Sequence, residues 1–226
     1  MLLVFDLDGT LVDSSQDLAE AASELVQGYG GAPLAVTDVM TMVGDGAPLL
    51  VRRALERSGL DPDTSGAFPR FLEIYDRRLM DHTVAYDGMH EVLALLVGRG
   101  PMAVLTNKPL APSIAILEAL GLRGFFSNVV GGDGPHARKP HPDGLLAIEA
   151  AWRSDPSGSP VSPGPTVMIG DSPADARTAA AAGCAFVFAR YGFGAGKFGA
   201  TPPATNWAVD HPRELPGILE RITLNS

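Results

Sequence analysis

Short apolar runs alternate with helical patterns along most of the chain. Five of these runs have the length and composition of buried strands, at residues 2–5, 102–105, 126–130, 166–169 and 185–189. Most of the segments between them repeat their apolar positions every three or four residues, which predicts amphipathic helices. Alternation of strands and helices predicts an α/β fold with a Rossmann-like, mostly parallel sheet and helices on both faces. A short edge strand at 207–209 and a helix in the tail from Pro212 complete this pattern.

One long stretch, residues 14–84, interrupts the alternation. It contains several helical patterns and no predicted strand between them. The first helix follows Ser14 or Ser15, either of which can cap it, and a second begins at Pro48. We therefore expect an inserted α-helical domain at 14–84. The core would then consist of residues 1–13 and 85–226, with hinges near 12–14 and 83–87.

The composition is that of a globular protein. Apolar residues make up 46% and charged residues 19% of the 226 residues. The net charge is −9, from 17 basic and 26 acidic side chains, which argues against a nucleic acid or an anionic membrane as partner. With Cys184 as the single cysteine and no apolar run long enough for a membrane span, we expect a cytoplasmic protein. Monomer and homodimer both remain open.

Residues capable of chemistry follow three of the predicted strands. Asp6 and Asp8 come directly after the first, Thr106 and Asn107 after the second, and Asp171 after the fourth. In open α/β sheets, ligands bind outside the carboxyl ends of the strands, and parallel strands present those ends along one edge. These side chains are therefore expected to converge on one site.

Three carboxylates directed at one place would repel each other unless a cation lies between them. Oxygen ligands alone favour Mg²⁺, which commonly recruits substrate phosphate. Lys139 adds a positive charge, and the hydroxyl and amide after the second strand add neutral donors, a combination that suits a phosphoryl group. One of Asp6 and Asp8 could attack phosphorus and form an aspartyl-phosphate, while the other handles protons.

Each of these features alone also has a purely structural interpretation. An Asp-x-Asp pair is common on surfaces, and Thr106-Asn107 could simply cap the following helix. Lys139 could be a solvated lysine, and Asp171 could mark no more than the start of a helix. The joint pattern, with each feature at or near a predicted strand end, favours a small phosphorylated metabolite as the ligand.

Four motifs resemble those of the haloacid dehalogenase superfamily. They are D-L-D-G-T at 6–10, L-T-N-K at 105–108, R-K-P at 138–140 and G-D-S-x-x-D at 170–175. The helices after the first motif resemble the helical cap of that superfamily. Within it, V-G-D-G-A-P-L-L at 43–50, together with T-N-K and K-P-H-P-D, is similar to the phosphoglycolate phosphatases.

The resemblance implies a role for each matching residue. Asp6 would be the nucleophile and a Mg²⁺ ligand, and Asp8 the general acid and base that binds Mg²⁺ through its backbone carbonyl. Asp171 would be the third protein ligand, while Thr106 and Lys139 would hold the phosphoryl group.

The remaining motif positions have supporting roles in this scheme. Asp175 is expected to act behind the ligands rather than as one of them. Gly9 would leave room for the phosphoryl group, and Asn107 would help to bind it. In the cap, Gly44 and Gly46 could let backbone N–H groups approach a small anion, although a plain interhelical turn explains them equally well.

Relatives with other chemistries fit less well. Dehalogenases lack an acidic residue at the position of Asp8, and phosphonate-cleaving relatives need a cap lysine, whereas the lysines here lie outside the cap. Sugar phosphomutases typically lack a threonine at the position of Thr10, although Arg52, Arg53 and Arg57 keep that alternative open.

The expected function is a Mg²⁺-dependent phosphatase for a small phosphomonoester, with 2-phosphoglycolate as the first candidate. Inorganic pyrophosphate or another small metabolite is the alternative substrate, and a sugar phosphomutase or a non-catalytic binding module are the remote ones. Two segments depart from the family pattern, the Pro/Ser-rich 154–165 and the Gly/Pro-rich 192–203. Both are expected to be loops that touch none of the motifs.

Overall fold

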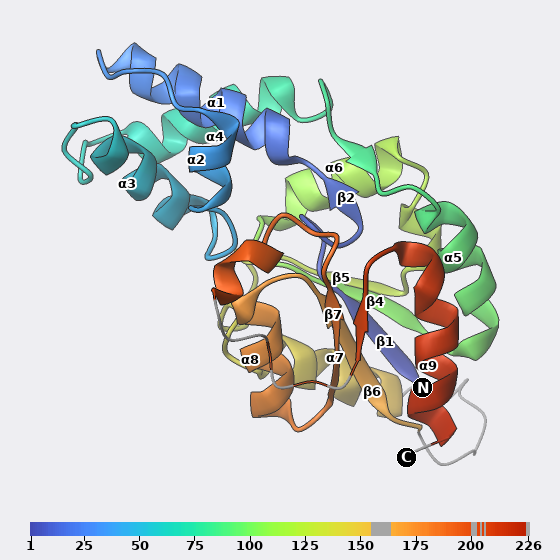
Figure 1. Ribbon diagram of the computed structural model, residues 1–226. Coiled ribbons are helices and arrows are strands. Elements are labelled where there is room, and N and C mark those ends of the chain that lie inside the picture. The colour runs from blue at the N-terminus through green and yellow to red at the C-terminus, as the bar shows by residue number, and fades with distance from the viewer. Residues whose placement is uncertain (155–163, 200–202, 204, 206, 225–226) are drawn as a thin grey trace.

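A parallel sheet forms the centre of the molecule. The computed structural model describes residues 1–154, 164–199, 203, 205 and 207–224. Within these residues the sheet has six strands in the order β5–β4–β1–β6–β7–β8, each parallel to its neighbours (Figure 1). The strands are β1 (Leu2–Phe5), β4 (Met102–Leu105), β5 (Asn128–Val130), β6 (Thr166–Gly170), β7 (Ala185–Ala189) and β8 (Ala208–Val209).

Helices cover both faces of this sheet, as the strand–helix alternation predicts. One face packs against α5 (Met89–Leu96), α6 (Leu110–Ala119) and α9 (Leu215–Leu224), the other against α7 (Asp143–Arg153) and α8 (Pro173–Ala182). In β1, Leu3 and Phe5 belong to the first apolar cluster, and Leu2 and Val4 to the second, because successive side chains of a strand point to opposite faces. The Rossmann-like α/β fold is confirmed.

The segment between β1 and α5 is mainly helical. Its helices are α1 (Ser15–Gly28), α2 (Val36–Met40), α3 (Ala47–Arg57) and α4 (Ala67–Arg78). Figure 1 shows them gathered at one end of the molecule, away from the N-terminus. Two short antiparallel strands, β2 (Val12–Asp13) and β3 (Val84–Ala85), join this group to the sheet. Strands of two residues carry no readable alternation, so the sequence pattern did not predict them.

Asp17 fixes one of these connections. Its side chain is fully buried and accepts hydrogen bonds from the backbone N–H groups of His82 and Thr83 and from the Thr83 hydroxyl. The start of α1 is thereby held to the segment that precedes β3. The two chain connections between the sheet and the helical group are therefore bonded to each other.

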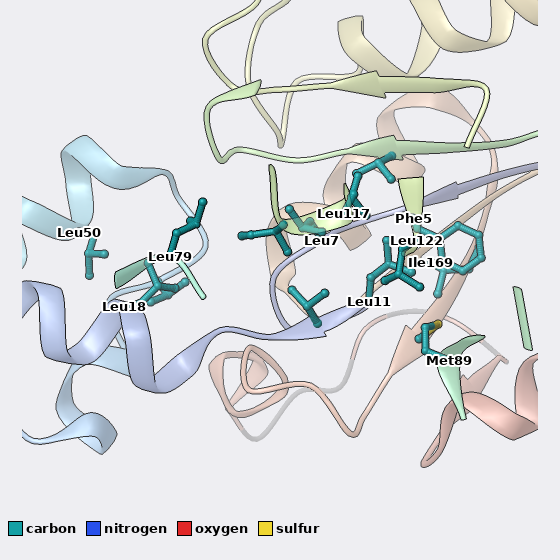
Figure 2. Packing of buried hydrophobic residues seen from close by; sticks show 14 of the residues in the cluster. Phe5, Leu7, Leu11, Leu18, Leu50, Leu79, Met89, Leu117, Leu122 and Ile169 are labelled. Carbon is teal, nitrogen blue, oxygen red and sulfur yellow. The ribbon is translucent and has the colours of Figure 1, made fainter. Parts of the chain in front are cut away.

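One apolar cluster runs from the sheet into the helical group. Figure 2 shows Phe5 and Ile169 at the sheet and Leu18 and Leu50 among the helices, and all of them belong to the same cluster. Leu7, which follows β1, is fully buried between these two regions. Burial of this kind is worth roughly 25 cal/mol per Å² of apolar surface, so the contact stabilises the sheet and the helical group together.

Several predicted boundaries differ in detail. The strand predicted from residue 126 begins at Asn128, because a short 3₁₀ turn occupies Arg123–Phe125. Helix α3 begins at Ala47, one residue before the predicted start at Pro48, and ends at Arg57, after which Gly59 has a positive φ of 75°. The loop expected at 154–165 lies mostly outside the described residues. The other short 3₁₀ turns are η1 (Val97–Arg99), η3 (Ala195–Phe198) and η4 (Pro212–Glu214).

No helix among the described residues has the length and apolar character that crossing a membrane requires.

Candidate active site

Three adjacent strands deliver acidic and polar side chains to the same edge of the sheet. Asp6 follows β1, Thr106 follows β4 and Asp171 follows β6, and β1 pairs with both of the other strands. All three side chains line one cavity of about 60 Å³. That is space for a few water molecules or a small ligand. The convergence expected from the strand ends is thus present in the fold.

A buried acidic cluster lies at this edge. Carboxylate oxygens of Asp6, Asp171 and Asp175 lie within 4.8 Å of one another. Burial, with the charge of Asp175 next, raises the pKa of Asp6 to about 7 against the opposing effect of Lys139. Burial, followed by the charges of Asp175 and Asp6, also raises the pKa of Asp171 well above its ordinary value.

This cluster fits a divalent cation. Its donors are oxygens only, which is the preference of Mg²⁺ and not of softer metals. A cation bound there would favour the ionised carboxylates, against the burial and the neighbouring charges that raise the pKa of Asp6 and Asp171. Asp8 could contribute through its backbone carbonyl, which accepts no hydrogen bond within the described part of the chain.

The two carboxylate oxygens of Asp6 have different surroundings. Oδ1 accepts from the Leu7 N–H at 2.7 Å and pairs with Lys139 Nζ at 2.8 Å. Oδ2 has no hydrogen-bond donor among the residues that the structure describes. One oxygen is therefore fixed in place while the other is left for chemistry.

Asp175 and Lys139 form a buried ion pair next to Asp6. Lys139 Nζ lies 2.7 Å from Asp175 Oδ1, and Asp175 Oδ2 accepts from both the backbone N–H and the hydroxyl of Ser172. Burial opposes the charge of Lys139, but Asp175 and Asp6 outweigh it and raise the pKa of this lysine. Because both oxygens of Asp175 already have partners, its geometry agrees with a role behind the ligands.

Gly9 faces Asp171 rather than open space. Its φ is 86°, and a Cβ built there would lie 2.0 Å from Asp171 Oδ2. The room expected for a phosphoryl group at Gly9 is thus taken up by the Asp171 carboxylate. Any larger residue at position 9 would displace this carboxylate from the cluster.

The Asp8 carboxylate has a separate set of partners. Both of its oxygens lie 3.1 Å from Lys108 Nζ, and Oδ1 accepts from the Ser14 hydroxyl at 2.6 Å. Ser14 therefore holds Asp8 and makes no side-chain cap on α1, contrary to one of the two capping alternatives. Lys108 Nζ is also 2.7 Å from the Tyr75 hydroxyl on helix α4.

Lys108 and Tyr75 are functional candidates that sequence reasoning missed. Burial opposes the charge on Lys108, but Asp8 and the Tyr75 hydroxyl outweigh it and raise its pKa. Burial raises the pKa of Tyr75 to about 12, so its hydroxyl stays protonated. The T-N-K motif contained a signal for Lys108, whereas Tyr75 was indistinguishable from the core residues of its helix.

Thr106 and Asn107, which follow β4, differ in whether their side-chain donors already have partners. The Thr106 hydroxyl oxygen accepts from the Lys108 N–H at 3.2 Å, and this hydroxyl donates no hydrogen bond to any residue that the structure describes. The Asn107 side-chain amide donates to Gly44 O at 3.1 Å and to Lys139 O at 2.9 Å. A phosphate contact expected from the Asn107 side-chain amide is therefore in competition with these two bonds, and Asn107 instead connects the helical segment to the sheet.

Gly44 and Gly46 both line the cavity, with φ values of 114° and 93°. A Cβ on Gly46 would lie 3.2 Å from Arg138 Nη1 and 3.5 Å from Asn107 O. A side chain at either position would have to adopt a strained backbone conformation. The turn between α2 and α3 thus approaches the strand ends closely because it is made of glycine.

The segment after β7 corrects one expectation. Residues 192–203 were predicted to touch none of the motifs, but the Gly194 N–H donates to Asp171 Oδ2 at 2.7 Å. Phe193 and Lys197 line the same cavity as Asp6. Because β7 is parallel to β6 and adjacent to it, its carboxyl end also lies at the active edge. Glycines at 192 and 194 let the backbone lie against Asp171.

This fold and this acidic strand-end site define a class of hydrolase. The chain belongs to the haloacid dehalogenase-like hydrolases, whose family model matches residues 1–183. Among its relatives, the phosphoglycolate phosphatase of Rhodobacter capsulatus is 34% identical over 96% of this chain and 96% of its own length. That of Rhodospirillum rubrum is 40% identical over 84% of this chain and 80% of its own length.

A solved structure agrees with these relatives. The crystal structure of a predicted phosphoglycolate phosphatase from Haemophilus somnus 129PT superposes with a TM-score of 0.83 at 29% identity. The match covers 96% of this chain and 97% of the other.

Proposed function

We propose that this chain is a Mg²⁺-dependent phosphatase that hydrolyses 2-phosphoglycolate through a phosphorylated Asp6. The observation that carries the proposal is the asymmetry of Asp6, whose Oδ1 is fixed by two donors while Oδ2 has none within the described residues. Asp171 lies beside it in the same acidic cluster. The names of the near full-length relatives support the choice of substrate.

The first half-reaction transfers the phosphoryl group to the enzyme. Asp6 Oδ2 attacks phosphorus, and the bond between phosphorus and the leaving oxygen breaks. Asp8 gives a proton to that oxygen, so that glycolate leaves with a neutral hydroxyl group and not as an alkoxide. Lys139 and the Thr106 hydroxyl would hold the phosphoryl oxygens. Asp6, Asp171 and the Asp8 carbonyl would hold Mg²⁺, and the bound ion would supply positive charge beside those oxygens.

The second half-reaction regenerates Asp6. Asp8, now ionised, takes a proton from a water molecule as that water attacks phosphorus. The bond between Asp6 and phosphorus breaks, and inorganic phosphate leaves. Lys108 and Ser14 hold the Asp8 carboxylate through both steps, at 3.1 Å and 2.6 Å.

The helical segment at 14–84 would act as the cap over this site. It contributes Gly44, Gly46 and Tyr75 to the lining of the cavity. Movement about the β2–β3 connection would admit substrate and then exclude water from the first half-reaction. A cavity of about 60 Å³ suits a small phosphomonoester better than a sugar phosphate.

A panel of substrates tests the proposal. We expect Mg²⁺-dependent release of phosphate, abolished by chelation, with kcat/KM for 2-phosphoglycolate about tenfold or more above that for pyrophosphate and sugar phosphates. A preference for pyrophosphate would overturn the substrate and leave the reaction class intact. No phosphate release from any member, with folded protein and Mg²⁺ present, would overturn the enzymatic function.

A further inference from the structure

Lys197 lies in the cavity on a short turn that is fixed from two sides. The turn, η3 (Ala195–Phe198), follows β7. On one side the Phe198 ring packs edge-on against Phe188 of β7, with centroids 4.7 Å apart. On the other, the Gly194 N–H is bonded to Asp171. These contacts hold the backbone of η3 in place, so the position of Lys197 at the cavity is built into the fold.

The ammonium group of Lys197 has no hydrogen-bond partner among the residues that the structure describes. Its Nζ is buried. The other two lysines differ: Lys108 and Lys139 each have a carboxylate within 3.1 Å. Burying an unpaired ammonium costs several kcal/mol, so a protein retains one where a ligand completes it. In agreement with this cost, burial lowers the pKa of Lys197.

The acidic groups near Lys197 are already engaged. Asp45 is paired with Arg53 at 2.8 Å, and Arg53 itself repels Lys197. Asp6 and Asp171 attract Lys197 from a distance, but in the proposed function their charges serve the metal. The positive charge of Lys197 is therefore left for an anion that enters the cavity.

The position of Nζ indicates which part of the substrate this would be. A Cβ built on Gly44 would lie 3.3 Å from Nζ, so the ammonium stands against the cap turn. Lys139, by contrast, lies at the opposite, sheet side of the site, bonded to Asp6 and Asp175. One lysine thus accompanies the phosphoryl position, and the other faces the cap.

We propose that Lys197 binds a carboxylate at the end of the substrate remote from the phosphoryl group, and so selects short phosphorylated carboxylic acids. The inference rests on the proposed function and names the residue behind its substrate choice. A single ammonium suits a carboxylate, whereas a second phosphate would call for more donors. Val43, Leu50 and Phe193 line the same cavity, and their apolar side chains exclude water and strengthen the ion pair.

A matched pair of substrates separates this role from general catalysis. The pair is 2-phosphoglycolate and 2-hydroxyethyl phosphate, which replaces the carboxylate by a neutral alcohol of similar size. For Lys197→Met we expect KM for 2-phosphoglycolate to rise ~10- to 100-fold, the loss of one charged hydrogen bond. KM for 2-hydroxyethyl phosphate should stay within about twofold of the wild-type value. Lys197→Arg should restore part of the loss.

The control is Arg70→Met, which removes one positive charge from an exposed cap residue paired with Glu73. This variant should leave the KM values for both substrates unchanged. Equal losses on both substrates in Lys197→Met would mean that Lys197 serves Asp171 or the fold, and unchanged values would mean that it is idle. Either result overturns the inference.

The same experiment distinguishes failure of the inference from failure of the proposed function. Extending the pair to 3-phosphoglycerate and glycerol 3-phosphate tests the carboxylate independently of glycolate. Wild-type preference for 2-phosphoglycolate that persists in Lys197→Met keeps the function and overturns the inference. The opposite outcome has two parts: the wild type shows no preference for 2-phosphoglycolate, and Lys197→Met raises KM for 3-phosphoglycerate but not for glycerol 3-phosphate. That outcome supports the role of Lys197 and overturns 2-phosphoglycolate as the substrate.

Discussion

Lys108 Nζ lies 3.1 Å from each carboxylate oxygen of Asp8, and the same ammonium group is bonded to the hydroxyl of Tyr75 on helix α4. It also stands 4.5 Å from the centre of the Tyr75 ring. The proposed acid and base is thereby connected to the cap through one buried lysine. A shift of helix α4 would therefore change the contacts of the Asp8 carboxylate.

Removing this connection should slow catalysis more than it weakens binding. For Lys108→Met we expect kcat to fall ~10- to 100-fold, because general acid–base catalysis is worth ~100-fold or more when the group is well placed. KM should change less. Tyr75→Phe, which keeps the ring and removes the hydroxyl, should show a smaller fall in kcat than Lys108→Met. Steady-state kinetics with 2-phosphoglycolate measure both.

Tyr29→Phe is the matched control, because Tyr29 lies exposed at the end of α1. It should behave as the wild type. An increase in KM at constant kcat in Lys108→Met would show instead that Lys108 binds substrate.

Gly9→Ala should damage both stability and metal binding. The new methyl group would lie 2.0 Å from Asp171 Oδ2. Strain at positive φ costs ~1–2 kcal/mol and overpacking ~1–3 kcal/mol, so we expect a loss of about 2–5 kcal/mol in the free energy of unfolding. Urea denaturation measures this loss, and calorimetric titration with Mg²⁺ should show weaker binding.

Gly59→Ala separates the two effects. Gly59 also has a positive φ, 75°, but a Cβ there would meet nothing within 4 Å. Gly59→Ala should lose only the part of the free energy of unfolding that comes from backbone strain, about 1–2 kcal/mol, and should keep the wild-type affinity for Mg²⁺. Equal losses in the two variants would mean that the approach of Asp171 to Gly9 is unimportant.

Stabilisation by Mg²⁺ should grow with pH. Without metal, burial raises the pKa of Asp6 to about 7, so the folded state binds more protons than the unfolded state between about pH 4 and 7. The contribution of Asp6 to the stability of the metal-free protein therefore falls as pH rises through this range. Mg²⁺ binds the ionised carboxylates, so the increase in Tm that it causes should be larger at pH 8 than at pH 5.

Asp6→Asn should reduce this dependence, because the amide at position 6 does not titrate, and Asp171, whose pKa burial also raises, should keep part of it. An increase in Tm independent of pH in the wild type would argue that the ion binds elsewhere than at this cluster.

The sheet and its active edge could be predicted because local patterns and one topological rule carry them. Apolar runs gave β4 and β7 their bounds, and the strand-end rule placed Asp6 with Asp171. The same rule applies to β7, whose carboxyl end carries Gly194 and Lys197. Their place at the site was missed because a Gly-rich segment has no polar motif to draw attention to it.

Contacts between the cap and the sheet could not be predicted. Tyr75 occupies a helical position typical of a core aromatic residue, and only the folded chain places its hydroxyl beside Lys108. Asn107 is predicted from the sequence to bind phosphate. Its bonds to Gly44 and Lys139 join segments far apart in the sequence, so the sequence does not reveal them. Pairings of this kind depend on tertiary geometry that no local pattern records.

The central claim is that Asp6 attacks phosphorus. Its most direct test is phosphate release from 2-phosphoglycolate with saturating Mg²⁺ by Asp6→Asn, beside calorimetric binding of the same substrate to that variant. The account predicts that turnover falls by at least ~10⁴-fold, as expected for loss of a nucleophile, while the substrate still binds. Turnover near that of the wild type would contradict the account and remove Asp6 as the nucleophile.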